Sequence, residues 1–229
     1  MKNGIYRHEL KYQINFADYL ALRQRLRAVM KPDEHIRDNG RYIIQSIYLD
    51  NYRDKALREK VDGMQKREKF RIRFYNGDLS YIVLEKKLKI NSLCMKIDAC
   101  LKEEECRALL EGQREWMLAH PSELVQELYC KMNSQQLRPR VLVSYIREPY
   151  VYSAGNVRVT FDSHIRTSLF HQNFLDQKMW DIDATDDPGS IILEVKYDAY
   201  LPEIVQSLLQ INGIRQQAFS KYGACRRFG

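Results

Sequence analysis

The sequence predicts an α+β fold in which a closed eight-stranded antiparallel β-barrel surrounds a charged lumen and helices pack on its outside. Two observations carry this prediction: charged residues recur on one face of several predicted strands, and four segments carry apolar stripes at helical spacing. The helices must cover the apolar side of the sheet, so the charged faces must line the interior. At 229 residues with 45% hydrophobic content, the chain can bury one sizeable core, which predicts a single domain over residues 1–229.

A hairpin over residues 69–88 shows the strand pattern most clearly. Cations occupy every second position from 67 to 73, and the apolar residues Phe70, Ile72 and Phe74 alternate with them. Asn76-Gly77-Asp78 is a turn signal, and the chain returns over residues 81–88 with Glu85 and Lys87 on one face. A single charged strand face is most often exposed to solvent. A charged interior is therefore indicated only if other strands repeat the pattern.

The alternation recurs along the chain. Glu9 and Lys11 share a strand face, as do Lys96 and Asp98 on a later strand. The other predicted strands cover residues 5–14, 41–49, 93–101, 141–152, 156–165 and 190–198. At least five of these eight strands carry charged residues on one face, which favours a charged lumen over an isolated wet surface.

Four amphipathic helices are predicted. The first follows a cap at Asn15 or Asp18 and is broken by Pro32, and the others cover residues 102–112, 122–133 and 203–211. Ser122 is a natural N-cap for the third of these helices. A shorter polar helix is predicted over residues 52–60.

Composition restricts the class of partner. The net charge of +7 and the pI near 9.1 indicate an anionic partner. Nucleic acid is not expected, because glutamates on the basic faces would repel its backbone. Five cysteines without C-x-x-C pairing indicate neither a disulfide framework nor a zinc site, and reduced thiols predict a cytoplasmic protein. No apolar run approaches the roughly 20 residues that span a bilayer, so membrane recruitment would need a membrane-protein partner.

A lumen lined by lysine and arginine needs counter-charge. Like charges about 4 Å apart repel by roughly 4 kcal/mol at an effective dielectric constant near 20. A polyphosphate chain would supply that counter-charge, and arginine forks suit phosphate oxygens. Interspersed carboxylates could hold a divalent cation that bridges phosphates, namely Glu9, Glu85, Asp162 and Glu194. The alternative is an open sheet with surface salt bridges, each worth no more than about 1 kcal/mol.

Eight ordered motifs resemble the VTC domain, the polyphosphate polymerase domain of the vacuolar transporter chaperone complex. That family belongs to the triphosphate tunnel metalloenzyme (CYTH-like) superfamily. The motifs occupy residues 6–12, 46–51, 71–75, 84–87, 145–147, 158–162, 193–196 and 220–222. The resemblance implies an eight-stranded antiparallel tunnel with a basic lumen, in agreement with the strand pattern.

The resemblance also implies a set of site residues. Those with catalytic, phosphate-binding roles are Lys11, Arg71, Arg73, Lys87, Arg147, Arg158 and Lys221. Further substrate-binding residues are Lys60, for which Arg58 is a competing position, Lys96, Ser220, Lys196 and Tyr48. Glu194 would be the metal-binding glutamate, with Mn²⁺ or Mg²⁺ as the cofactor. Arg7 replaces the first glutamate of the superfamily's Glu-x-Glu-x-Lys signature, which disfavours two-metal triphosphatase chemistry and agrees with the VTC branch.

The function expected from this resemblance is phosphoryl transfer. The lumen would bind the triphosphate of ATP and pass the γ-phosphoryl group to a polyphosphate chain, by positioning and electrostatics alone. The alternatives are a tunnel triphosphatase acting on tripolyphosphate or a nucleoside triphosphate, and a non-catalytic polyphosphate-binding module. The expected partners are therefore ATP or another triphosphate, polyphosphate and phosphate.

Overall fold

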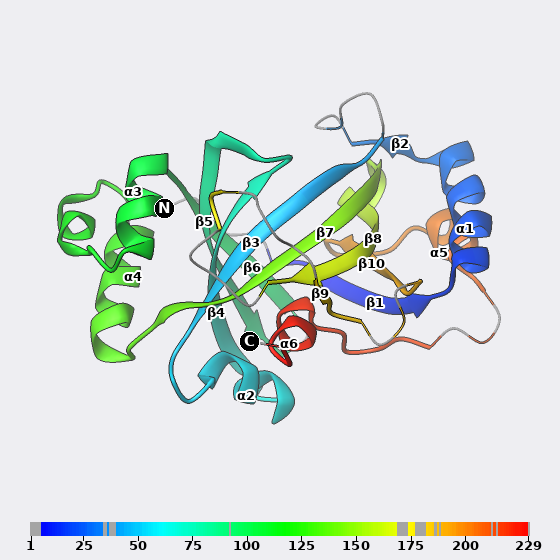
Figure 1. The fold of residues 1–229 in the computed structure, drawn as a ribbon. Coiled ribbons are helices and arrows are strands. Elements are labelled where there is room, and N and C mark those ends of the chain that lie inside the picture. Colours follow the sequence, from blue (N-terminus) through cyan, green and yellow to red (C-terminus); the bar gives the residue numbers. More distant parts are fainter. Residues whose placement is uncertain are drawn as a thin grey trace.

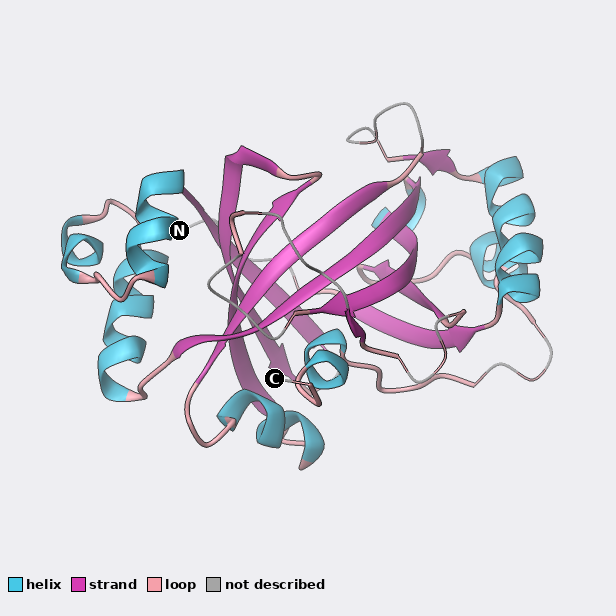
Figure 2. Cartoon of the chain, in the orientation of Figure 1, coloured by secondary structure: helices cyan, strands magenta, loops and turns pink. Residues whose placement is uncertain are grey.

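A curled antiparallel sheet forms the centre of the computed structural model (Figures 1 and 2). The structure describes residues 6–33, 36, 40–91, 93–168, 174–176, 182–185, 187, 189–211, 213 and 215–228. Eight strands follow one another around the sheet in the order β1 (His8–Ile14), β10 (Ile191–Tyr197), β8 (Val157–Thr167), β7 (Arg138–Tyr152), β3 (Tyr42–Asp50), β4 (Lys66–Tyr75), β5 (Asp78–Ile90) and β6 (Leu93–Leu101). These strands confirm all eight predicted ones, with ends that differ by a few residues.

Two short strands were not predicted. β2 (Lys31–Pro32) pairs with the end of β7, and β9 (Ile182–Asp183) pairs with β8. Two residues are too few to show a period in the sequence, so such strands are visible only once their partners are in place.

The seam between β1 and β6 departs from the predicted closed barrel. In the part of the chain that the structure describes, one bridge joins the two edges: Arg7 and Cys94 exchange two backbone hydrogen bonds of 3.0 Å. Beyond this bridge, side chains span the seam, with Lys87 Nζ 2.7 Å from Glu9 Oε2. The tunnel is therefore confirmed, while its backbone closure is limited to one point.

The β4–β5 turn follows the predicted turn signal. Tyr75 pairs with Asp78, which leaves Asn76 and Gly77 as a two-residue turn. Both have positive φ, 52° and 72°, a conformation that asparagine and glycine tolerate best. The turn fixes the hairpin register, and with it the face on which each charged residue lies.

Helices cover the outside of the sheet on two opposite sides (Figure 1). α1 (Phe16–Val29) and α5 (Glu203–Leu208) pack on β1, β8 and β10 through Leu22, Val205 and Val195. Asn15 caps α1 as predicted, because its side-chain oxygen accepts a hydrogen bond from the Asp18 backbone N–H at 2.8 Å.

On the other side, α3 (Glu103–Leu110), the 3₁₀ helix η1 (Glu115–Ala119) and α4 (Glu123–Ser134) cover β3 to β6. Phe74, Leu84 and Leu128 are fully buried there. Ser122 occupies the predicted N-cap position of α4, although its side chain makes no capping hydrogen bond. None of the described helices is both long and apolar enough to cross a membrane.

The remaining helices lie at one end of the tunnel. α2 (Lys55–Val61) corresponds to the predicted helix over residues 52–60, whereas α6 (Lys221–Cys225) was not predicted, because five residues are too few for a helical stripe. A short 3₁₀ turn, η2 (Ala154–Asn156), links β7 to β8.

Asp50 ties α2 and α6 to the end of β3. Its fully buried carboxylate accepts hydrogen bonds from the backbone N–H groups of Ala56 at 3.0 Å and Leu57 at 3.3 Å, and from the Tyr222 hydroxyl. One side chain therefore anchors both helices that flank this end of the tunnel.

Replacing this anchor should destabilise the fold. We expect Asp50→Ala to lower the free energy of unfolding by about 2–4 kcal/mol, since it strands buried donors on two helices. Chemical denaturation measures the effect, with Asp62→Ala, at the exposed end of α2, as the control. Equal stability of the two variants would contradict the anchoring role.

Candidate functional site: a charged tunnel

The curled sheet encloses a cavity of about 1850 Å³. Among the described residues that line it, fourteen are lysine or arginine and eight are aspartate or glutamate. The alternation of strand side chains explains this lining, because the charged positions of β1, β4, β5, β6 and β10 face inward while their apolar neighbours face the helices. The lumen is thus cationic overall and contains a minority of carboxylates.

Glu194 is the most heavily engaged carboxylate of the lumen. Its Oε1 lies 2.7 Å from Lys221 Nζ and 3.1 Å from Lys11 Nζ, and its Oε2 lies 3.2 Å from Arg147 and 3.3 Å from Lys196. Burial raises the pKa of this carboxyl, but the surrounding cations outweigh burial and hold the pKa well below its usual value. Glu194 is therefore an ionised hub for four cations.

Asp162 supports the same hub from beneath. Arg147 donates two hydrogen bonds of 2.6 Å to its carboxylate, and Lys221 Nζ lies 2.6 Å away. Asp162 is fully buried and is not among the residues that line the cavity. These two hydrogen bonds fix the plane of the Arg147 guanidinium and so hold it in one orientation at the lumen.

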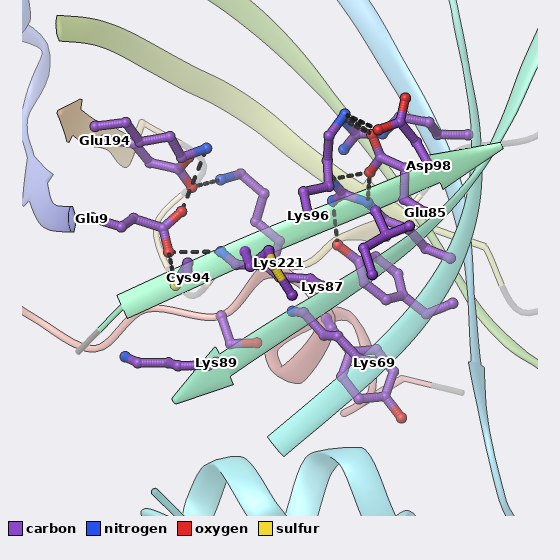
Figure 3. Close-up of a pocket in the computed structure, with 18 of the residues that line it drawn as sticks. Glu9, Lys69, Glu85, Lys87, Lys89, Cys94, Lys96, Asp98, Glu194 and Lys221 are labelled. Carbon is purple, nitrogen blue, oxygen red and sulfur yellow. Dashed lines mark hydrogen bonds and ion pairs between the residues drawn. The ribbon is translucent and has the colours of Figure 1, made fainter. Parts of the chain in front are cut away.

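Glu85 organises a second group of cations on the opposite wall (Figure 3). Its Oε2 accepts a 2.6 Å hydrogen bond from Arg71, while its Oε1 lies 3.1 Å from Lys96 and 3.4 Å from Arg73. Burial opposes ionisation of this carboxyl, but Arg71, Arg73 and Lys96 lower its pKa far below the usual value. Glu85 thereby holds both arginines in place on this wall of the lumen.

Glu9 joins the two groups at the seam. It pairs with Lys87 at 2.7 Å and with Lys196 at 3.4 Å, so the Lys196 ammonium lies between Glu9 and Glu194. Burial lowers the pKa of Lys196 to about 8 against the attraction of these two carboxylates. This lysine thus contributes a close internal counter-ion to both acids.

Tyrosines cover the spaces between the cations. Tyr145 lies under the Arg147 guanidinium at 5.2 Å and the Lys221 ammonium at 4.8 Å, measured to its ring centroid. Tyr48 accepts a 2.8 Å hydrogen bond from Arg71 and lies 5.1 Å from Lys69 Nζ. Burial raises the pKa of Tyr48, but Arg71, Lys69 and Arg73 outweigh it and lower the pKa to about 7.

Four lumen cations make no ion pair with any carboxylate that the structure describes. Figure 3 shows two of them, Lys69 and Lys89, away from the ion-paired groups. Strand register places Lys69 opposite Lys87 and Arg67 opposite Lys89, so like charges face each other across β4 and β5. Together with Lys60, which lies on α2, these residues form the unpaired row: Lys60, Arg67, Lys69 and Lys89.

The structure brings nearly all of the predicted site residues into one cavity. Those that line it are Lys11, Tyr48, Lys60, Arg71, Arg73, Lys87, Lys96, Arg147, Arg158, Lys196, Ser220, Lys221, Glu9, Glu85 and Glu194. Asp162 lies behind the lining. The predicted set omitted Lys69, Lys89 and Tyr145, although the period of two along each strand places them on the same faces as Arg71, Lys87 and Arg147.

The donor set limits the kind of metal site that the lumen can form. Among the described residues, no group of three or more histidine, cysteine, aspartate or glutamate side chains converges on one point. The residues therefore do not fit a cage of protein carboxylates. They do fit a cation held by one lumen carboxylate, Glu194, with the remaining ligands supplied by phosphate oxygens and water, which is how Mg²⁺ often binds.

Two solved structures resemble the fold. A putative adenylyl cyclase from Hippeastrum, described as having a dominant triphosphatase activity, matches with a TM-score of 0.59 and 13% identity over 97% of this chain and 96% of that chain. A putative adenylate cyclase from Bacillus halodurans matches with a TM-score of 0.52 and 15% identity over 90% and 87% of the two chains. No curated protein sequence matches significantly. At such identities the likeness shows the fold alone.

The curled sheet and its charged lumen define a tunnel-fold protein with a cationic interior, and the two solved structures share this fold. The family model of the VTC domain matches residues 6–228, nearly the full length of the sequence. The chain therefore belongs to the VTC domain family, which confirms the resemblance carried by the eight sequence motifs.

Tyr48 should titrate near neutrality. We expect one tyrosinate to appear in the ultraviolet absorbance at about pH 7, because the native pKa of Tyr48 is about 7 whereas an unfolded tyrosine has a pKa of about 10. The ionised form then stabilises the native state increasingly between these two values, fully above the higher one and not below the lower one.

The matched variant is Tyr48→Phe, which should abolish this early titration and leave the other tyrosines unchanged. Burial and neighbouring groups raise the pKa values of Tyr42, Tyr19 and Tyr222, so their signals remain separate. A wild-type protein without tyrosinate absorbance until about pH 9 to 10 would contradict the assignment.

Proposed function

We propose that this protein is a polyphosphate polymerase-like phosphoryl transferase, which moves the γ-phosphoryl group of ATP onto a polyphosphate chain inside its tunnel. The observation that carries the proposal is the unpaired row, which extends the cationic lining beyond the compensated residues around Glu85 and Glu194. A cytoplasmic location and a membrane-protein partner remain expectations from the sequence.

The length of the cationic wall favours a chain as the ligand. On β4 alone, four alternate side chains from Arg67 to Arg73 span about 20 Å at the usual strand rise, which is longer than three linked phosphate groups. The cations near Glu85 and Glu194 already have carboxylate partners, whereas the unpaired row has a deficit of negative charge. A phosphate chain that continues past the triphosphate would supply that charge.

The compensated residues suit the reacting triphosphate. Glu85 orients Arg71 and Arg73, and Asp162 orients Arg147, so three guanidinium groups are positioned before the substrate arrives. Phosphoryl transfer needs positioned cations along the transferred group more than it needs a protein nucleophile. A direct transfer fits this set of residues: a terminal oxygen of the polyphosphate chain attacks the γ-phosphorus of ATP, the bond to the β,γ-bridging oxygen breaks and ADP leaves, without a covalent enzyme intermediate.

A divalent cation, Mn²⁺ or Mg²⁺, is part of the proposal. Glu194 would hold it together with phosphate oxygens, and the cation would supply charge neutralisation on the triphosphate. Lys11, Lys196 and Lys221, which contact Glu194, would pair with phosphate oxygens on the same side of the lumen.

One assay separates this function from its alternatives. The protein is incubated with ATP and Mn²⁺, and the products are resolved as chain polyphosphate and free phosphate. Polymer supports the proposal. If only free phosphate forms, the protein is a tunnel triphosphatase instead. If ATP binds tightly without turnover, the protein is a polyphosphate-binding module.

Substitution of the unpaired row tests chain binding without removing a partner from any buried carboxylate. We expect Lys69→Ala combined with Lys89→Ala to weaken polyphosphate binding about tenfold or more, because each lost contact is a charge-assisted one. Tripolyphosphate should be affected less. Thermal stability should hold or rise, since the pair carries like-charge repulsion and no ion pair.

Calorimetry with long-chain polyphosphate and with tripolyphosphate measures both affinities. Lys31→Ala, which removes an exposed lysine on β2, is the control for each single lysine variant. Arginine variants are unsuitable here, because Arg71 and Arg73 compensate the buried Glu85. If the variant loses the same affinity for both ligands, the unpaired row contacts the triphosphate and not a chain that continues beyond it.

The metal role of Glu194 has its own test. We expect Glu194→Gln to shift the midpoint of the Mn²⁺ titration to higher concentration and to reduce turnover by orders of magnitude, while metal-free tripolyphosphate still binds to the basic residues. Glu85→Gln is the matched variant, because Glu85 is another buried carboxylate among lumen cations. An unshifted midpoint in Glu194→Gln, with a shift in Glu85→Gln, would move the metal to the opposite wall.

A further inference from the structure

Three tyrosines gather at the end of the lumen that lies farthest from α2. Tyr42, Tyr75 and Tyr81 all line the cavity next to the β4–β5 turn. The rings of Tyr75 and Tyr81 lie 6.3 Å apart between centroids and are nearly parallel, at 24°, while Tyr42 meets Tyr75 edge-on at 5.8 Å. Tyr81 keeps 51% of its surface exposed, so one aromatic face at this mouth is open.

The character of the lining changes along the hairpin toward these tyrosines. On β4 the inward positions run from Arg67 through Arg73 and end at Tyr75, and on β5 they run from Lys89 and Lys87 through Glu85 to Tyr81. The carboxylate of Asp78 lines the same end of the cavity, and Asp98 lies further along the wall, opposite Glu85 on β5. A ligand that lies along this wall must therefore be anionic toward α2 and uncharged at the β4–β5 turn.

Phosphate-binding groups lie directly beside the tyrosines. The Arg73 guanidinium is 5.7 Å from the Tyr75 ring centroid and donates to its hydroxyl at 3.4 Å, and Arg158 donates to the Tyr42 hydroxyl at 2.8 Å. A triphosphate held by these arginines would carry its attached nucleoside to the tyrosine rings without leaving the cavity.

The polar groups near the turn offer little for reading one particular base. The Asn76 side-chain oxygen accepts from the Ile43 N–H at 2.8 Å, and Asp78 Oδ1 accepts from the backbone and hydroxyl of Ser80 at 3.0 and 2.6 Å. Stacking on tyrosine requires only a π-face, which every nucleobase has.

We propose that Tyr75 and Tyr81 form a base-tolerant stacking site for the nucleobase of a nucleoside triphosphate, at the β4–β5 mouth of the tunnel. The site rests on the proposed function in that it takes the lumen ligand to be a triphosphate. It also sets a direction: the nucleoside lies at the turn, and the phosphates point toward α2. The unpaired row then lies beyond the γ-phosphate, on the side where a growing chain would be held.

The experiment compares a ligand that has a base with one that lacks it. Calorimetry measures the dissociation constants of a non-hydrolysable ATP analogue and of inorganic tripolyphosphate for wild type, Tyr81→Ala and Tyr81→Trp. We expect Tyr81→Ala to weaken the nucleotide about five- to tenfold, in the lower part of the range for base–aromatic stacking, because Tyr81 is half exposed. Tripolyphosphate binding should stay unchanged, and Tyr81→Trp should restore nucleotide binding.

Controls separate the site from a packing role of the tyrosine pair. Tyr200→Ala removes an equally exposed tyrosine outside the cavity and should change neither constant. Analogues of GTP and CTP should bind wild type within a few-fold of the ATP analogue. Equal loss of both ligands in Tyr81→Ala, or no loss of either, overturns the stacking site while the triphosphate function stands. A wild-type protein that binds neither ligand overturns the proposed function and the stacking site with it.

Discussion

The electrostatic balance inside the tunnel constrains the rest of this structure. Lysine and arginine side chains that line a closed lumen repel one another, and this repulsion would destabilise the fold. Four carboxylates offset it here by forming ion pairs with neighbouring cations. Glu194 and Asp162 hold one wall, Glu85 holds the other, and Glu9 joins them at the seam. Near α2 the positive charge is not fully balanced, because four cations lack carboxylate partners among the described residues. Buried ion pairs seldom stabilise a fold as much as apolar packing would, so their retention in the lumen is consistent with a binding role.

The inside-out arrangement of the barrel follows from this balance. Because charge fills the interior, the apolar side of every strand must face outward, and the fold needs helices to keep that side from water. α1 with α5 and α3 with α4 supply two separate hydrophobic cores on opposite sides of the sheet. The apolar packing that stabilises the fold thus lies outside the tunnel, and the charged residues that would bind a ligand lie inside it. Lumen residues such as Lys69 can vary with little effect on the packed cores.

The sequence predicted those features that depend on a short period. Alternation and β-rich runs identified all eight principal strands, and alternation assigned Arg71, Arg73, Glu194 and their neighbours to one interior. It could not distinguish Asp162, sealed behind Arg147, from Glu194, which faces the lumen, because both occupy inward positions of neighbouring strands. The tyrosine group at the β4–β5 mouth was equally inaccessible, since Tyr42 is brought to Tyr75 by the pairing of β3 with β4 rather than by any local motif.

The position of β1 in the sheet has a consequence for how the molecule forms. β1 begins near residue 8, and in the described part of the chain its extended pairing is with β10, so that His8 lies opposite Tyr197. During synthesis, Lys11 must therefore wait until the chain has been extended to Glu194, its carboxylate partner. Contacts so distant in sequence carry a large loop-closure entropy and form slowly. The tunnel therefore cannot close before β10 has been synthesised, and Lys221 on α6 completes its charged interior later still.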